Sequence, residues 1–163
     1  MHNFNKPFIV NKSFSNIKET VKKFNISGDG YFTKKCHTFF KDKYKFTNNF
    51  LTPSCTAALE MIALLLNIEP GDEIIMPTFT FVSCANAFVL RGARIRFVDS
   101  NSNDPNIDVS KINALVNKKT KAILVVHYAG IPCDMDALEK IKKKHSLFLI
   151  EDCAHAIDVY YKT

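Results

Sequence analysis

The chain has 163 residues, of which 47% are hydrophobic and 23% charged, and its formal net charge is +6. This length suits one domain with a buried core, and the composition excludes an intrinsically disordered chain. The lysines are scattered rather than gathered in a stripe. That distribution favours a solvated surface or an anionic small-molecule partner over nucleic acid.

Residues 1–50 are predicted to form an N-terminal helical arm with a glycine-rich loop. The segment SFSNIKETVKKF (13–24) is typical of a helix with a serine cap, and KKCHTFFKDKY (34–44) has apolar residues at helical spacing. Between them, SGDGYFT is expected to turn tightly at Gly28 and Gly30. The pattern favours a surface helix–loop–helix over an arm that reaches across a neighbour or a ligand.

From residue 51 onward, short apolar runs alternate with longer amphipathic segments. The apolar runs predict strands at 73–76, 94–98, 122–126 and 147–150. The intervening segments predict helices at 56–67, 82–91, 109–116 and 134–145, with EPGDE and RGA closing the first two. Such alternation is typical of βαβ units, so residues 51–163 are predicted to be an α/β domain with a mainly parallel sheet flanked by helices.

In an open parallel sheet, ligands bind beyond the carboxyl ends of the strands, and several loops at that end are informative. Ser54 and Thr56 stand at the entry to the first predicted helix of this domain. They could cradle a phosphate at the helix N-terminus, although taken alone they favour a simple N-cap. Phe79 and Phe81 follow the strand at 73–76 and could stack on a planar heterocycle or fill the core.

The last two predicted strands also deliver polar side chains to this end. His127 and Tyr128 follow the strand at 122–126, where a lone histidine is usually structural. Asp152 follows the strand at 147–150 and could cap the next turn or hold a ring nitrogen protonated, which makes a pyridine ring an electron sink. His155, three residues later, could contact substituents of the same ring.

The cysteines and the chain ends give no sign of an extracytoplasmic protein. The five cysteines are odd in number, widely spaced and without a C-x-x-C pair, so they predict neither a disulfide framework nor a zinc site. The longest uncharged apolar stretch, MIALLLNI, is far shorter than the roughly 20 residues of a membrane span. The start, MHNFNKPFIVNKSF, lacks a secretory signal pattern. We therefore expect no membrane partner and a cytoplasmic location.

Several motifs in the same order carry a resemblance to a known family. GDGYFTKKC, LTPSCTAALEM, MPTFTFVSCANAF, VVHYAGIPCDMDAL and FLIEDCAHAIDVYYK resemble the DegT/DnrJ/EryC1/StrS sugar aminotransferases. These are pyridoxal-phosphate (PLP) enzymes of the type I aminotransferase fold, and the likeness covers nearly the whole chain. The resemblance implies that residues 51–163 are the first part of the large PLP-binding domain of that fold.

The resemblance also implies roles for particular residues. Ser54, Cys55 and Thr56 would hold the cofactor phosphate, and the family often has glycine where Cys55 stands. Asp152 would pair with the pyridine nitrogen. The other implied ring contacts are Phe81, which would stack on the pyridine, and His155, near the ring hydroxyl. The implied substrate contacts are Gly28, Asp29, Gly30, His127 and Tyr128.

The implied reaction is a ping-pong transamination in a homodimer. Glutamate gives its amino group to the cofactor, which passes it to the 4-keto carbon of dTDP-4-keto-6-deoxyglucose. The family's Schiff-base lysine lies in a serine–phenylalanine–histidine motif beyond Lys162, and Lys162 does not correspond to it. We therefore expect no Schiff-base lysine and no C-terminal domain in this chain, no transamination by it alone, and exposed apolar surface along a sheet edge.

Three interpretations remain open. The chain could be the N-terminal part of an aminotransferase, either as a truncated gene product or as one half of a split enzyme with a separate C-terminal half. It could belong to a related sugar 3-dehydratase, in which histidine replaces the lysine. It could also be a non-catalytic remnant that binds the cofactor, a nucleotide sugar or a full-length paralogue.

Overall fold

A computed structural model describes residues 8–162 of the chain. The chain divides into two units, Met1–Leu51 and Thr52–Thr163. Within residues 8–162, no helix combines the length and the apolar character that crossing a membrane would require.

The first unit has two helices, α1 (Asn11–Lys22) and α2 (Tyr31–Tyr44). The predicted serine cap is wrong, because α1 begins at Asn11 and Ser13 lies inside its first turn, while Val10 occupies the N-cap position. The connecting loop also differs from the expectation. Its residues with positive φ are Phe24, at 53°, and Asp29, at 56°, and not Gly28 or Gly30.

The second unit contains a parallel sheet, which confirms the predicted α/β class. Its strands are β1 (Glu73–Pro77), β2 (Arg94–Val98), β3 (Thr120–Val126) and β4 (Phe148–Asp152). They lie in the order β2-β1-β3-β4, and every neighbouring pair is parallel. The two central strands, β1 and β3, are buried almost throughout, because other strands pair with both of their edges.

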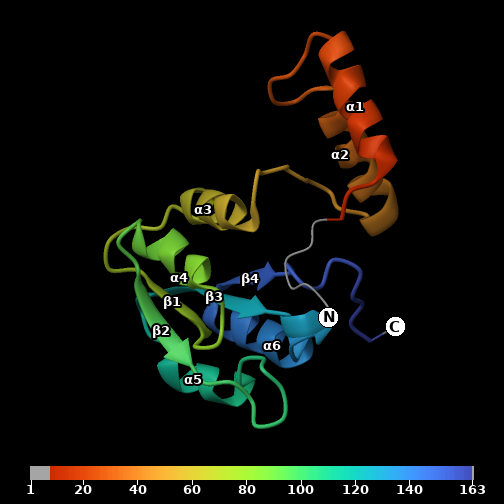
Figure 1. Ribbon diagram of the computed structural model, residues 1–163. Coiled ribbons are helices and arrows are strands. Elements are labelled where there is room, and N and C mark those ends of the chain that lie inside the picture. Colours follow the sequence, from red (N-terminus) through yellow and green to blue (C-terminus); the bar gives the residue numbers. More distant parts are fainter. Residues whose placement is uncertain (1–7, 163) are drawn as a thin grey trace. The chain divides into compact units, whose positions relative to one another are not determined.

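Helices cover both faces of this sheet (Figure 1). On one face lie α3 (Cys55–Leu65) and α4 (Val82–Val89), and on the other lie α5 (Ile112–Leu115) and α6 (Met135–His145). The side chains of each strand alternate between these layers. In β1, for example, Ile74 packs in the cluster under α3 and α4, whereas Ile75 packs in the cluster over α5 and α6.

The segment at 109–116 is broken where a single helix is predicted. A 3₁₀ turn, Val109–Lys111, leads into the short α5, and Val116 is already extended. The Asp108 carboxylate accepts hydrogen bonds from the backbone N–H and the hydroxyl of Ser110, and this cap favours a tight first turn.

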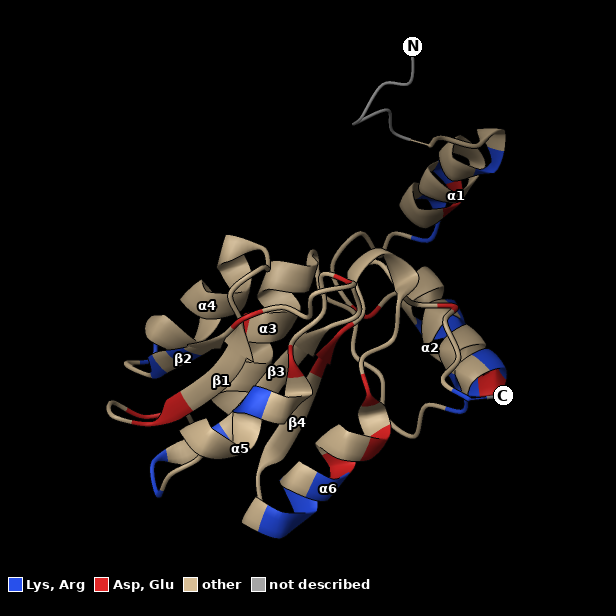
Figure 2. Cartoon of the chain, turned by 90° about the horizontal axis from the view of Figure 1, so that it is seen from below, with Lys and Arg blue, Asp and Glu red and all other residues tan. Residues whose placement is uncertain are grey.

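Charges are placed to suit the helix dipole in α6, the best capped helix of the second unit. Asp134 is its N-cap and accepts a hydrogen bond from the Ala137 N–H at 3.1 Å, and Asp136 lies in the first turn. The last turn holds three lysines and a histidine. Figure 2 shows the result, with acidic residues at one end of α6 and basic residues at the other.

Candidate functional site

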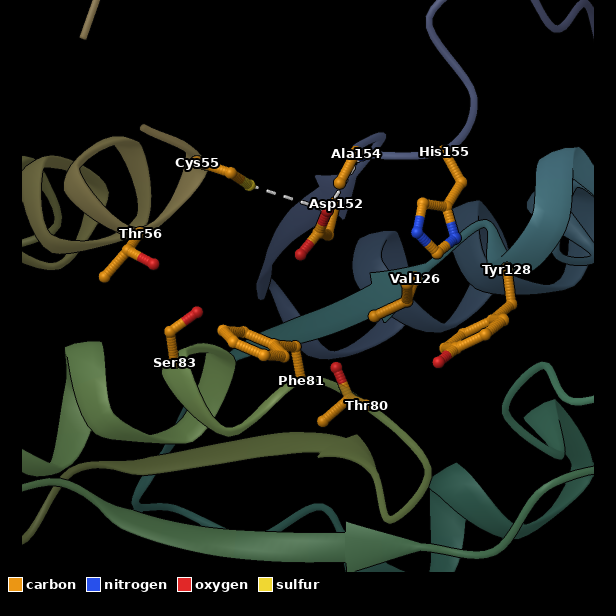
Figure 3. Close-up of a pocket in the computed structure, with 10 residues that line it drawn as sticks. All are labelled: Cys55, Thr56, Thr80, Phe81, Ser83, Val126, Tyr128, Asp152, Ala154 and His155. Atoms are coloured by element: carbon orange, nitrogen blue, oxygen red, sulfur yellow. Dashed lines mark hydrogen bonds between the residues drawn. The ribbon is translucent and has the colours of Figure 1, made fainter. Parts of the chain in front are cut away.

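A cavity of about 240 Å³ opens at the carboxyl ends of the strands in the second unit. Six of the residues singled out in the sequence line it, from four separate segments of the chain (Figure 3). They are Cys55, Thr56, Phe81, Tyr128, Asp152 and His155. The topology explains this convergence, because parallel strands that start at one edge of a sheet also end at one edge.

Asp152 is the last residue of β4, and the strand register fixes where its side chain points. It pairs with Val126 of β3, and the His127 N–H donates to the Asp152 carbonyl at 3.2 Å. Since Val126 and Ile150 both face the layer of α3 and α4, Asp152 faces that layer too. Its side chain is only 6% exposed, and it lies between the first turns of the two helices.

The Asp152 carboxylate has three hydrogen-bond donors, two of which are thiols. Cys84 donates to Oδ2 at 3.2 Å, and Cys55 donates to Oδ1 at 3.7 Å. The Ala154 N–H also donates to Oδ1, at 3.0 Å. Within residues 8–162, no lysine, arginine or histidine forms an ion pair with this carboxylate.

Both thiols are kept protonated by their surroundings. Burial, together with the hydrogen bond to Asp152, raises the pKa of Cys84 to about 11. Burial and the charge of Asp152 also raise the pKa of Cys55. Because a thiol must hold its proton to donate it, both groups remain donors to the carboxylate at neutral pH.

Aromatic rings border the cavity on the other side. The Tyr128 ring lies 4.7 Å from the Phe79 ring and 5.3 Å, edge to face, from the imidazole of His155. His155 Nδ1 accepts a hydrogen bond from the Ala129 N–H at 3.4 Å. Phe81, the N-cap residue of α4, is 70% exposed, so its ring is free to stack on a ligand.

A buried amide that the sequence analysis missed holds the turn that carries Tyr128. Asn106 is 3% exposed, and its side-chain oxygen accepts from the Tyr128 N–H at 3.1 Å. Its side-chain nitrogen donates to the Ile131 carbonyl at 2.8 Å. No local motif announces this role, because Asn106 lies more than twenty residues from both partners in the sequence.

The cavity also includes residues that the sequence reasoning passed over: Thr80, Ser83, Val126 and Ala154. The signal for the first two was available, since they flank Phe81 at the start of a predicted helix. The buried Thr80 hydroxyl makes no hydrogen bond of ordinary geometry to residues 8–162, although it lies near enough to the Cys84 thiol to oppose the rise in that group's pKa.

At the start of α3, the structure shows the N-cap that the sequence favoured. Ser54 is the N-cap of the helix, and its hydroxyl accepts from the Ala57 N–H at 3.1 Å. Cys55 and Thr56 follow in the first turn and line the cavity, with no acidic residue in that turn. The end of α3 that carries the partial positive charge of the helix dipole therefore borders the cavity.

His127 lies outside this cavity, on the opposite face of the sheet. It is 5% exposed, and its Nε2 lies 2.9 Å from the Glu151 carboxylate, while Nδ1 accepts from the Cys133 N–H at 3.1 Å. The ring proton is therefore on Nε2, which donates to Glu151. Cys153 is close by, but a histidine that binds a metal through one ring nitrogen donates the proton on the other to an acceptor. If Nε2 bound a metal, Nδ1 would face the Cys133 N–H, which is a donor.

The predicted substrate residues Gly28, Asp29 and Gly30 belong to the first unit. They form the loop that precedes α2, and Gly30 is its N-cap residue. All residues of the cavity belong to the second unit.

Comparison with known proteins shows which family this chain resembles. The sequence profile of the DegT/DnrJ/EryC1/StrS aminotransferase family matches residues 7–163. GDP-perosamine synthase from Escherichia coli O157:H7 is 35% identical over 157 residues, which are 96% of this chain and 43% of that protein.

Solved structures agree with the sequence match. An aminotransferase from Psychrobacter cryohalolentis superimposes with a TM-score of 0.90 at 30% identity, over 96% of this chain and 40% of that one. A protein from Streptococcus pneumoniae assigned as a sugar aminotransferase, in its PLP form, gives a TM-score of 0.86 at 27% identity, over 96% of this chain and 44% of that one.

The chain thus spans about two fifths of the length of these relatives. Their match runs through all four loops that build the cavity, and a PLP form is among them. The chain belongs to the DegT/DnrJ/EryC1/StrS family of PLP-dependent sugar aminotransferases.

Proposed function

We propose that the cavity beside Asp152 binds pyridoxal 5'-phosphate and that the protein acts as a nucleotide-sugar aminotransferase. One observation carries the proposal. A buried carboxylate with only thiol and amide donors from residues 8–162, and no cation, lines a cavity with aromatic walls. A buried charge is costly unless it is paired, and a protonated pyridine nitrogen is a cationic donor that would pair with it.

The residues around the cavity fit this cofactor. When bound, pyridoxal phosphate supplies an electron sink for carbanion chemistry at the amino carbon. In the proposal, Asp152 holds a proton on the ring nitrogen, because a carboxylate beside that nitrogen favours its charged form. Phe81 covers a face of the ring, and His155 contacts the ring hydroxyl.

The start of α3 is proposed to hold the phosphate. Ser54, Cys55 and Thr56 surround the helix N-terminus, where free backbone N–H groups and the helix dipole attract an anion. The Thr56 hydroxyl lines the cavity and adds a side-chain donor. The bulk of Cys55, at a position where similar enzymes often have glycine, makes this loop tighter.

The substrate proposed is dTDP-4-keto-6-deoxyglucose, with glutamate as amino donor. In this proposal the protein is similar to dTDP-4-amino-4,6-dideoxygalactose transaminase, an enzyme of cell-surface polysaccharide synthesis of the enterobacterial common antigen type. Tyr128 and the loop of Gly28, Asp29 and Gly30 are the proposed substrate contacts in a homodimeric enzyme. His127, on the other face of the sheet, acts through the turn that follows it.

A cytoplasmic location is part of the proposal. All five cysteines lie within residues 8–162, and each is a free thiol. Unpaired cysteines suit a reducing compartment.

A GDP-linked 4-keto sugar is the second candidate substrate. It is favoured by the 35% identity to a protein named GDP-perosamine synthase. Isothermal titration calorimetry of the protein with dTDP and with GDP separates the two candidate substrates. Tighter binding of dTDP supports the first candidate, and tighter binding of GDP replaces it with the second.

The cofactor proposal is tested with pyridoxamine 5'-phosphate, which needs no lysine to bind. We expect Asp152→Asn to weaken its affinity at least about tenfold, because a charge-assisted hydrogen bond to the ring nitrogen is lost. Glu151→Gln is the matched control, since it makes the same chemical change one residue away on the opposite face. Equal affinities of the two variants, measured by ligand fluorescence, would contradict the proposal.

A further inference from the structure

Cys84 is a buried thiol that the proposed chemistry does not use. It is 1% exposed and lies in the first turn of α4, where it packs within the core cluster under α3 and α4. A cysteine in such a place usually fills space as a small hydrophobe. Here its sulfur also lies 3.2 Å from Asp152 Oδ2, which is close for a contact between sulfur and oxygen.

We infer that Cys84 is a positioning residue for Asp152, whose carboxylate it orients toward the cavity by donating its S–H to Oδ2. The inference rests on the proposed function, because orientation matters only if the carboxylate meets a ring nitrogen. The Ala154 N–H and the Cys55 thiol hold the other oxygen, Oδ1. Together, the donors on both oxygens fix the plane of the carboxylate.

The Cys84 donor is also uncharged. A thiol, unlike an ammonium group, holds the carboxylate in place without neutralising its charge. Oδ2 therefore keeps lone-pair capacity for a stronger, charged donor. Since the Cys84 pKa of about 11 keeps the sulfur protonated, the donor persists over the whole working range of pH.

The contact itself is tested by Raman spectroscopy of the S–H stretch, without any ligand. The difference between the wild type and Cys84→Ala isolates the Cys84 band. We expect this band at a lower frequency than the band of the exposed Cys36, and we expect it to rise in Asp152→Asn, because an amide oxygen is a weaker acceptor than a carboxylate. A band that Asp152→Asn leaves in place would overturn the inference.

The positioning role is tested by binding of pyridoxamine 5'-phosphate labelled with ¹⁵N in the ring. We expect Cys84→Ala to weaken affinity by about threefold to tenfold and to reduce the protonated fraction of the ring nitrogen in the ¹⁵N spectrum. Cys84→Ser keeps a donor and should restore both to within about twofold of the wild type. These two readouts separate positioning from packing.

Cys133→Ala is the matched control, because Cys133 is equally buried but donates to the Val126 carbonyl on the other side of the sheet. If Cys133→Ala weakens binding as much as Cys84→Ala, or if Cys84→Ser fails to rescue, the thiol acts only as core filler. If the wild type itself does not bind the ligand, the proposed function fails, and the Raman result still decides whether Cys84 holds Asp152.

Discussion

At the scale of single residues, the site depends on side chains that hold other side chains. Asn106 uses both ends of its amide to hold the turn at 128–131, which carries the Tyr128 ring next to His155. Ala129 in that turn has a positive φ of 52°, a conformation that costs about 1–2 kcal/mol for a residue other than glycine. The buried amide offsets that cost and fixes one wall of the cavity.

Replacing Asn106 should therefore loosen this wall. We expect Asn106→Ala to lower the free energy of unfolding by about 1–3 kcal/mol, because it leaves a backbone donor and a backbone acceptor without their partner. The measurement is urea unfolding followed by circular dichroism. Asn106→Asp is the informative companion, since it keeps the acceptor for the Tyr128 N–H and removes the donor to the Ile131 carbonyl.

Both Asn106 variants are expected to be less stable than the wild type. If both hydrogen bonds contribute, Asn106→Asp also loses stability, because its new carboxylate faces the Ile131 carbonyl. A stability within about 0.5 kcal/mol of the wild type for Asn106→Ala would show that the turn holds without the amide.

At the scale of elements, two glycine turns join helices to strands at the far end of the sheet from the cavity. Gly71 precedes β1 and Gly92 precedes β2, and their φ angles are 97° and 87°. The turns touch, because the Gly71 N–H donates to the Gly92 carbonyl at 3.2 Å. Only Gly92 is crowded: a Cβ there would lie 2.9 Å from Pro70 Cα, whereas a Cβ at Gly71 would meet nothing within 4 Å.

This difference separates backbone strain from steric clash. We expect Gly71→Ala to cost about 1–2 kcal/mol of unfolding free energy, from the positive φ alone. Gly92→Ala should cost at least about 1 kcal/mol more, because backbone atoms of Pro70 must move. Chemical denaturation of both variants provides the comparison. Equal losses of unfolding free energy would show that Pro70 moves aside without an energetic cost.

The sequence was most informative where a residue's environment is set by its own neighbours in the chain. Continuous apolar runs such as 122–126 predicted the strands, and the rule of the carboxyl ends then brought Phe81, Asp152 and His155 to one cavity. The partners of Asp152 could not be predicted in this way. Cys84 reaches it across 68 residues, and only the fold, which brings the first turn of α4 near the end of β4, reveals that contact.

Local chemistry misled in two places. Ser13 looked like a cap, but the helix starts two residues earlier, at Asn11, and its N-cap residue, Val10, has no side-chain oxygen. His127 follows a strand just as Tyr128 does, yet the alternation of side chains turns it to the opposite face.

At the scale of the whole molecule, the buried hydrophobic clusters within residues 8–162 belong to the second unit. Both buried clusters consist of residues between Leu59 and Ile150. The sheet has two edge strands, β2 and β4, and Phe97 and Phe148 on them are each more than half exposed. Apolar side chains on edge strands favour association with further polypeptide.

We therefore expect residues 52–163 to fold without the first unit, since removing 1–51 takes no residue from either cluster. Circular dichroism should show a cooperative urea transition for that fragment. A second fragment, 52–145, serves as the control, because it lacks β4 and the buried Leu147 and Ile150. A cooperative transition for the control and none for 52–163 would reverse the assignment of the core.

The alternation in β4 makes the site sensitive to the register of this strand on β3. Glu151 and Asp152 are neighbours in the chain but face opposite layers, one toward His127 and the other toward the thiols. A slip of β4 by one residue along β3 would turn Glu151 to the layer of α3 and α4 and Asp152 to the layer of His127. The same slip would turn the buried Ile150 away from its cluster, so the apolar residues that stabilise the strand also keep the shorter carboxylate at the cavity.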